Sequence, residues 1–208
     1  MICLISVTAS VFAQTTLVSR GSSWKYLDNG SDQGSAWTAP VFDDSAWAAG
    51  NAQLGYGDGD EATIVRYGKD PNAKFITTYF RRSFNVSNPG GFTNLTLNIL
   101  RDDGAVIYLN GAEVFRTNMP AGTVGYQTLA PVAIGGADET VFIQATLNAS
   151  LLVPGANVLA VEIHQSSGNS SDISFDLDLI GQTGASVTRG PYLQVGTANA
   201  MTVRWRTN

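Results

Sequence analysis

The chain has 208 residues, of which 44% are apolar and 14% are charged, and glycine is frequent at 22 residues. Its formal net charge of −5 argues against nucleic acid as a partner, because nucleic-acid binding requires lysine and arginine clustered on one face. The composition is typical of a globular protein rich in strands and loops, and it excludes a disordered chain or a coiled coil.

Residues 2–13 form an apolar segment that is too short to span a bilayer. The segment ends in small residues that suit cleavage after Ala13, although no lysine or arginine precedes it. We therefore predict that residues 1–14 are a truncated signal peptide and that the protein is secreted, either extracellular or periplasmic; the alternative is an apolar strand. Cys3 lies in this segment, so the mature chain would contain no cysteine and would depend on its apolar core.

Alternation of apolar and polar residues dominates the rest of the chain and predicts strands. The expected strands are residues 74–86, 95–100, 105–109, 113–115, 141–147, 157–165 and 173–180. Asn110-Gly111 predicts a tight hairpin. Many short strands with glycine-rich turns indicate an all-β antiparallel sandwich, which we assign to residues 19–181, followed by a linker at 182–188.

The last two of these strands carry polar side chains opposite their apolar faces. If they form a hairpin, Glu162 lies across from Ser174 or Asp176, and Arg81 is a candidate partner for the carboxylates. His164 is the only histidine in the chain. Because neither a second histidine nor a nucleophile motif accompanies it, we expect His164 to pair with Glu162 rather than to bind zinc or act as a general base.

Two acidic segments are candidates for chemistry. Asp58, Asp60 and Glu61 lie among glycines and could supply oxygen ligands to a structural calcium ion, although their spacing differs from the twelve-residue calcium loop and a solvated acidic turn is the alternative. Asp102 and Asp103 precede a glycine, which favours turn capping over acid–base catalysis. We expect no other cofactor in this chain.

Aromatic residues are frequent in the first third of the sequence. We expect Trp24 and Trp47 in the core, because aromatic side chains gain much from burial. Trp37 and Tyr56 have serine, glycine and aspartate neighbours, so we expect them to be exposed and able to stack on sugars. The candidate ligand-binding residues are Trp37, Tyr56, Tyr67, Glu162 and His164.

Four stretches in one order resemble the galactose-binding-like jelly roll, including the sugar-binding module of β-galactosidase-type glycosidases. They are residues 42–47 (FDDSAW), 78–84 (TYFRRSF), 102–111 (DDGAVIYLNG) and 157–164 (NVLAVEIH). The resemblance covers most of residues 20–181. It implies the architecture of that fold, and it assigns no sugar site.

The C-terminal segment, 189–208, is similar to a different family. Residues 192–195 and 201–206 alternate and predict a hairpin, and RGPYLQ at 189–194 with TVRWRT at 202–207 resembles the start of the fibronectin-like domain of purple acid phosphatases. The resemblance implies an incomplete fibronectin/Ig-like strand pair and a parent metallophosphoesterase with a two-metal centre. A chain with one histidine cannot build that centre itself.

The sequence therefore predicts a non-catalytic accessory module at the front of a secreted purple-acid-phosphatase-like enzyme. Its expected role is to bind carbohydrate or a cell-surface glycan, or to act as a spacer, beside fibronectin-like and catalytic domains of the same chain. Two alternatives remain open: a purely structural domain that stabilises its neighbour, and the sugar-binding module of a glycoside hydrolase. A glycosidase within this chain is least favoured, because nothing pairs its carboxylates.

Overall fold

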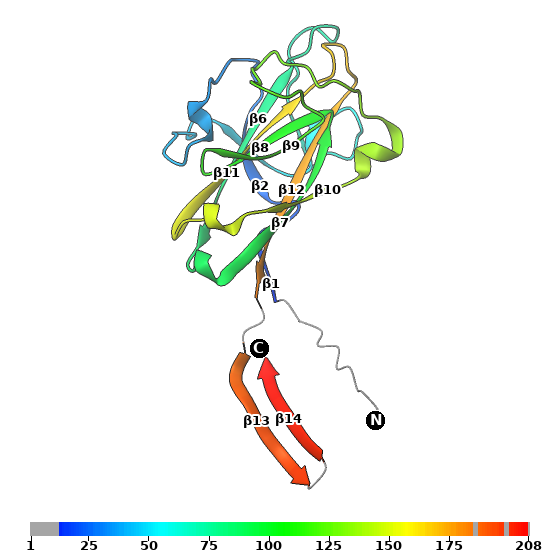
Figure 1. Cartoon of the computed structure of the whole chain (residues 1–208). Coiled ribbons are helices and arrows are strands. Elements are labelled where there is room, and N and C mark those ends of the chain that lie inside the picture. The colour runs from blue at the N-terminus through cyan, green and yellow to red at the C-terminus, as the bar shows by residue number, and fades with distance from the viewer. Residues whose placement is uncertain (1–12, 185–186, 198–199, 208) are drawn as a thin grey trace.

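The computed structural model describes residues 13–184, 187–197 and 200–207, and it describes the side chains of residues 13–184. Two six-stranded sheets face each other as a sandwich, and a two-stranded sheet follows them in the chain (Figure 1). The all-β prediction is confirmed. Within the described residues, no helix has the length and apolar character needed to cross a membrane.

The first sheet is organised around β12 (Ile173–Thr183), whose one edge pairs with β7 (Phe92–Asp102). The other edge is shared, since β4 (Leu54–Tyr56) pairs with residues 173–175 and β1 (Gln14–Val18) with residues 179–182. The outer strands are β10 (Ile143–Leu147), which pairs with β7, and β5 (Thr63–Ile64), which runs parallel to β4.

The second sheet has its strands in the order β3, β2, β6, β11, β8, β9. Their bounds are Ala48–Asn51, Ser23–Leu27, Thr77–Val86, Gly155–His164, Gly104–Leu109 and Ala112–Thr117. Short 3₁₀ turns lie in the connections: η1 (Ala36–Thr38), η2 (Pro89–Gly91), η3 (Gly136–Thr140) and η4 (Ala149–Leu151). The predicted hairpin is confirmed, because Asn110 and Gly111 both have positive φ, 53° and 89°, between β8 and β9.

The core lies between the two sheets and follows from the alternation of each strand. Leu95, Leu97 and Ile99 of β7 and Leu177 and Leu179 of β12 are all fully buried on the inner face. Each such side chain contributes about 1.5–3 kcal/mol of transfer free energy relative to exposure. The predicted strands from residue 74 onward are thus confirmed, with shifts of a few residues at their ends.

The predicted hairpin between the strands at 157–165 and 173–180 is wrong. β11 belongs to the second sheet and β12 to the first, so residues 165–172 cross between the sheets. Glu162 is therefore not opposite Ser174 or Asp176, and its neighbours in register are Tyr79 on β6 and Val106 on β8. The crossing places the polar faces of β11 and β12 on opposite outer surfaces of the sandwich.

The limits of the sandwich are wider than the predicted 19–181. β1 begins at Gln14, and β12 continues to Thr183, whose amide donates to the carbonyl of Ala13 at 2.9 Å. Residues 1–12, which hold most of the predicted signal peptide, lie outside the described residues. β13 (Val187–Thr197) and β14 (Ala200–Thr207) form the expected antiparallel pair.

Candidate functional site

A second apolar cluster lies on the outer face of the second sheet. Trp37, Trp47, Tyr79 and Ala160 form it. The centroid of the Trp37 ring is 4.8 Å from that of Tyr79, in an edge-to-face arrangement, and 6.4 Å from that of Trp47. The segment before β3 therefore folds over this face of the sheet instead of extending into solvent.

Arg81 holds this covering segment to β6. Its side chain is only 1% exposed, and its guanidinium donates to the carbonyls of Trp37 and Ala39 and, through Nε, to Asp44 Oδ2 at 2.9 Å. Arg81 thus pairs with Asp44, and the prediction that it neutralises the β11 or β12 carboxylates is wrong.

Beside this cluster the surface is hollowed into a pocket of about 360 Å³ that we call the aromatic pocket. Its wall combines three tyrosines and a tryptophan with two carboxylates and several glycines and hydroxyls. The lining residues are Asp32, Gly34, Ser35, Trp37, Thr38, Tyr79, Tyr108, Gly111, Thr123, Val124, Gly125, Tyr126 and Glu162.

Among the lining residues that belong to the strands of the second sheet, Glu162 is the charged one. It projects from β11 with 5% of its surface exposed, and its Oε1 accepts a hydrogen bond from the Tyr108 hydroxyl at 2.8 Å. His164 lies on the same face of β11, with Nε2 at 3.4 Å from Glu162 Oε2. The predicted Glu162–His164 pair is confirmed.

The His164 ring is fixed from its other side. Nδ1 is 2.8 Å from the carbonyl oxygen of Thr128 and 3.0 Å from the Thr77 hydroxyl. Because a carbonyl oxygen only accepts, Nδ1 carries a hydrogen. His164 is fully buried and is not among the lining residues, and its hydrogen bonds are made by Nδ1, so it fixes the 126–128 segment rather than contacting a ligand.

Burial and Glu162 together keep the hydroxyls of Tyr79 and Tyr108 protonated. The pKa of Tyr108 is raised first by desolvation and then by the negative charge and hydrogen bond of Glu162. The pKa of Tyr79 is raised by the same two causes, desolvation and the charge of Glu162. Both hydroxyls therefore remain hydrogen-bond donors across the physiological range.

The predicted exposures of Trp37 and Tyr56 are wrong. Trp37 is 1% exposed and Tyr56 is 6% exposed, because loop 28–47 packs on the sheet and because β4 pairs with β12. Neither ring can stack on a ligand without rearrangement. Trp24 and Trp47 are buried as predicted, at 1% and 7%.

The five candidate ligand-binding residues divide into two groups. Trp37 and Glu162 line the aromatic pocket, and His164 lies behind it in contact with Glu162. Tyr56 and Tyr67 pack on each other elsewhere, with ring centroids 5.0 Å apart. Tyr67 is 36% exposed and has the Lys74 ammonium 5.5 Å from its ring centroid, within cation–π range.

The acidic loop after β4 is organised by its own hydrogen bonds. Both oxygens of Glu61 accept main-chain amides, from Asp58 and Gly59, each at 3.0 Å. Asp58 accepts the Ser174 hydroxyl at 3.0 Å, and burial followed by contact with Asp172 raises its pKa. The predicted trio of Asp58, Asp60 and Glu61 does bring carboxylate oxygens within 4.8 Å of one another.

Asp102 and Asp103 differ in their surroundings. The Asp103 carboxylate accepts the main-chain amides of Ile134 and Ser166, both at 2.6 Å, which confirms a structural role in loops. Asp102 is fully buried without a hydrogen bond to either oxygen, and desolvation, followed by Asp103, raises its pKa to about 9.

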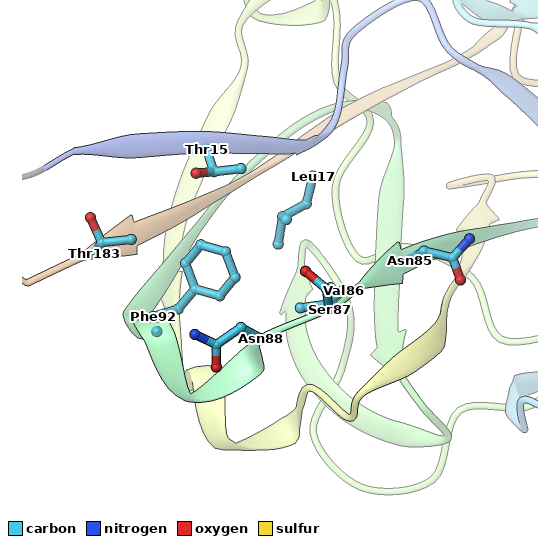
Figure 2. Close-up of a pocket in the computed structure, with 9 residues that line it drawn as sticks. Thr15, Leu17, Asn85, Val86, Ser87, Asn88, Phe92 and Thr183 are labelled. Atoms are coloured by element: carbon cyan, nitrogen blue, oxygen red, sulfur yellow. The ribbon is translucent and has the colours of Figure 1, made fainter.

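Another hollow, of about 320 Å³, lies at the end of the sandwich where β1 and the end of β12 meet (Figure 2). Figure 2 shows the Phe92 ring beside Leu17 and the side chains of Thr15, Thr183 and Asn88 around them. No charged side chain lines this hollow. We therefore consider the aromatic pocket, with its carboxylates and hydroxyls, the better candidate for recognition of a polar ligand.

Sequence reasoning missed Tyr108 and Tyr126, which are the partly exposed rings of the aromatic pocket. The signal for Tyr108 was present, because alternation in β8 turns Ile107 and Leu109 inward and Tyr108 outward. Tyr126 lies in a loop with no periodicity, and the Thr77 hydroxyl, donating to its carbonyl at 2.8 Å, helps to fix it.

No family model and no curated protein matches this chain. Among solved structures, β-glucuronidase from Bacteroides uniformis is similar, with a TM-score of 0.51, 17% identity and coverage of 82% of this chain and 18% of that chain. The fold is a galactose-binding-like jelly-roll sandwich. β-Glucuronidase from Ruminococcus gnavus, solved with D-glucuronic acid, is also similar, with a TM-score of 0.51, 11% identity and coverage of 99% of this chain and 35% of that chain. The chain thus spans about a fifth to a third of the length of these enzymes.

Proposed function

We propose that this β-sandwich is a non-catalytic accessory module that binds carbohydrate in the aromatic pocket. One observation carries the proposal: two partly exposed tyrosines, Tyr108 and Tyr126, flank a nearly buried carboxylate that one of them already hydrogen-bonds. Tyrosine rings offer apolar faces to sugar rings, and a carboxylate oxygen accepts hydroxyl hydrogen bonds. The fold similarity to β-glucuronidases supports a role beside carbohydrate chemistry.

The size of the pocket suits a short contact with a glycan. Its volume of about 360 Å³ falls at the low end of ligand pockets, which span about 300–1,000 Å³. Glu162 makes one hydrogen bond through Oε1, which leaves lone pairs on both oxygens for ligand hydroxyls. We infer that neutral, hydroxyl-rich sugars bind here, because the two carboxylates of the wall, Asp32 and Glu162, repel acidic ones.

Affinity gel electrophoresis of the full chain in a series of soluble polysaccharides tests this function. Wild-type protein is expected to be retarded by at least one neutral polysaccharide. Glu162→Gln should weaken the interaction about 10- to 100-fold, since a hydrogen bond to a charged group contributes about 1.5–3 kcal/mol. Tyr67→Ala is the matched control, because Tyr67 is partly exposed but lies outside the pocket.

Retardation by none of the polysaccharides would contradict the carbohydrate proposal and favour a spacer or stabilising domain. Equal weakening by Glu162→Gln and Tyr67→Ala would place the binding surface elsewhere on the sandwich. Thermal unfolding of each variant, measured in parallel, separates a lost contact from a lost fold.

We infer that a module of this kind belongs to a larger enzyme, for which two parents are proposed. The resemblance of residues 189–208 points to a secreted purple-acid-phosphatase-like metallophosphoesterase. The fold similarity to β-glucuronidases extends over most of the chain and favours a glycoside hydrolase instead. The coding sequence beyond Asn208 decides between them, since a phosphatase would show Asp-x-His and Gly-Asn-His blocks and a glycosidase would not.

A further inference from the structure

Three carboxylates from distant parts of the chain meet on the outer side of the first sheet. Asp58 follows β4, Glu139 belongs to η3 and Asp172 immediately precedes β12, and one oxygen of each lies within 4.8 Å of the others. The pairing of β4 with β12 sets this arrangement, because Tyr56 is in register with Ile173. Gly57 permits the close approach, since a Cβ there would collide with Asp172 and its φ is +115°.

The side chain of Asp102 is a fourth carboxylate next to this trio. Asp102 ends β7 in register with Ser174, whose hydroxyl donates to Asp58 Oδ2 at 3.0 Å. Its side chain is fully buried and neither oxygen has a hydrogen-bond partner. The charges that act most strongly on it are those of Asp103, Asp172 and Glu139. Buried side-chain oxygens nearly always have a partner, and a positive charge is the partner that suits the four acidic groups gathered here.

The protein's own cations do not supply this charge directly. Among residues 13–184, no ion pair within 4.0 Å includes Asp58, Asp102, Glu139 or Asp172. Lys74 is nearby, but its ammonium donates to the carbonyls of Ser170 and Ser171. Arg101 is also close enough for the charge of Asp102 to act on it, yet its Nε has no hydrogen-bond partner.

We propose that Asp58, Glu139 and Asp172 bind one calcium ion, with Asp102 as the buried carboxylate behind it. Calcium holds its oxygen ligands at about 2.3–2.6 Å, so oxygens that lie within 4.8 Å of one another, as in the trio, can share one ion. Side chains from separate loops suit its flexible coordination better than the strict octahedron of magnesium. All ligands are oxygens, which disfavours zinc.

This site differs from the one predicted from the acidic loop alone. Both oxygens of Glu61 are engaged by the amides of Asp58 and Gly59, and Asp60 accepts the Gln53 amide at 3.2 Å. These two residues shape the loop that carries Asp58. The ion lies on the first sheet, whereas the aromatic pocket lies on the second, so the proposal does not depend on carbohydrate binding.

Isothermal titration of the full chain with CaCl₂, after removal of metal by a chelator, tests the site. We expect one ion per chain and a dissociation constant on the order of 10⁻⁵–10⁻³ M. Saturating calcium should raise the melting temperature by about 5–10 °C. Glu139→Gln should weaken binding at least about 10-fold, whereas Asp138→Asn, its exposed neighbour, should bind calcium like the wild type.

Glu139 is the best position to change because it is half-buried, so its loss does not open the core. Asp172→Asn gives a second test from the buried side of the site. No heat of binding at 10 mM CaCl₂, or wild-type affinity in both Glu139→Gln and Asp172→Asn, would overturn the proposal. Equal weakening by Asp138→Asn and Glu139→Gln would also overturn it, since that result indicates diffuse attraction to negative charge.

Discussion

Arg81 is the side chain whose removal tests the architecture of the aromatic pocket most directly. We predict that Arg81→Met destabilises the protein and displaces the segment that covers the second sheet. The guanidinium is the donor for the carbonyls of Trp37 and Ala39 and the ion-pair partner of Asp44. Methionine keeps much of the aliphatic packing and removes every donor.

The expected magnitude follows from these contacts. Leaving a buried acceptor without its donor costs about 1–3 kcal/mol, and breaking a buried ion pair by deleting one partner costs about 3–5 kcal/mol. The Asp44 side chain is 26% exposed, so solvent reduces the second contribution. We expect the free energy of unfolding to fall by about 4 kcal/mol, which corresponds to a melting temperature lower by about 8–16 °C.

Urea denaturation followed by tryptophan fluorescence measures this change, and Arg82→Met is the matched control. Arg82 is only partly buried, and its Nη1 makes a single hydrogen bond, to the carbonyl of Ser23. Its replacement should change the free energy of unfolding by less than about 1 kcal/mol. If the free energy of unfolding of Arg81→Met lies within about 1 kcal/mol of wild type, Arg81 does not hold the covering segment on the second sheet.

Three further changes test the core, the sheet pairing and the buried charges. Leu177→Ala should cost about 2–5 kcal/mol in chemical denaturation, whereas Val41→Ala, at a residue 94% exposed, should stay within about 0.5 kcal/mol. Gly55→Ala should lower the yield of folded protein, because its Cβ would collide with the main chain of β12, whereas Gly125→Ala should be tolerated; equal yields would contradict the β4–β12 pairing. Burial raises the pKa of Asp176, so its contribution to stability is largest at low pH and declines as pH rises above about 4. Asp176→Asn should therefore gain stability relative to wild type between pH 4 and pH 7, and an unchanged difference across that range would count against the raised pKa.

The strands after residue 74 were predictable because their centres alternate clearly. β7, β11 and β12 each span ten or eleven residues and contain three or four apolar side chains at successive alternate positions. β3, β4 and β5 span only two to four residues, which is too short for a period to be recognised in them. β4 also depends on pairing with β12, which lies far away in the sequence.

The candidate site was predictable only where it lies on regular strands. Alternation placed Glu162 and His164 on one face of β11, and the structure confirms their contact. The burial of Trp37 was not predictable from its polar neighbours in the sequence. It depends on Arg81 of β6, whose guanidinium donates a hydrogen bond to the Trp37 carbonyl. Similarly, the meeting of Asp58 with Asp172 depends on strand order, which alternation does not encode.

The hydrogen bonds between Ala13 and Thr183 have a consequence for how this domain can be joined to others. They bring the two ends of the sandwich together beside β1, at one end of the sandwich (Figure 1). A domain with adjacent ends can be inserted into a surface loop of a host protein without stretching the host. The same geometry permits circular permutation: a short glycine linker from residue 183 to residue 14, with new termini opened in the exposed loop at 121–123, should preserve the sandwich. In such a permuted protein, residues 183 and 14 would be joined by a turn between two neighbouring strands.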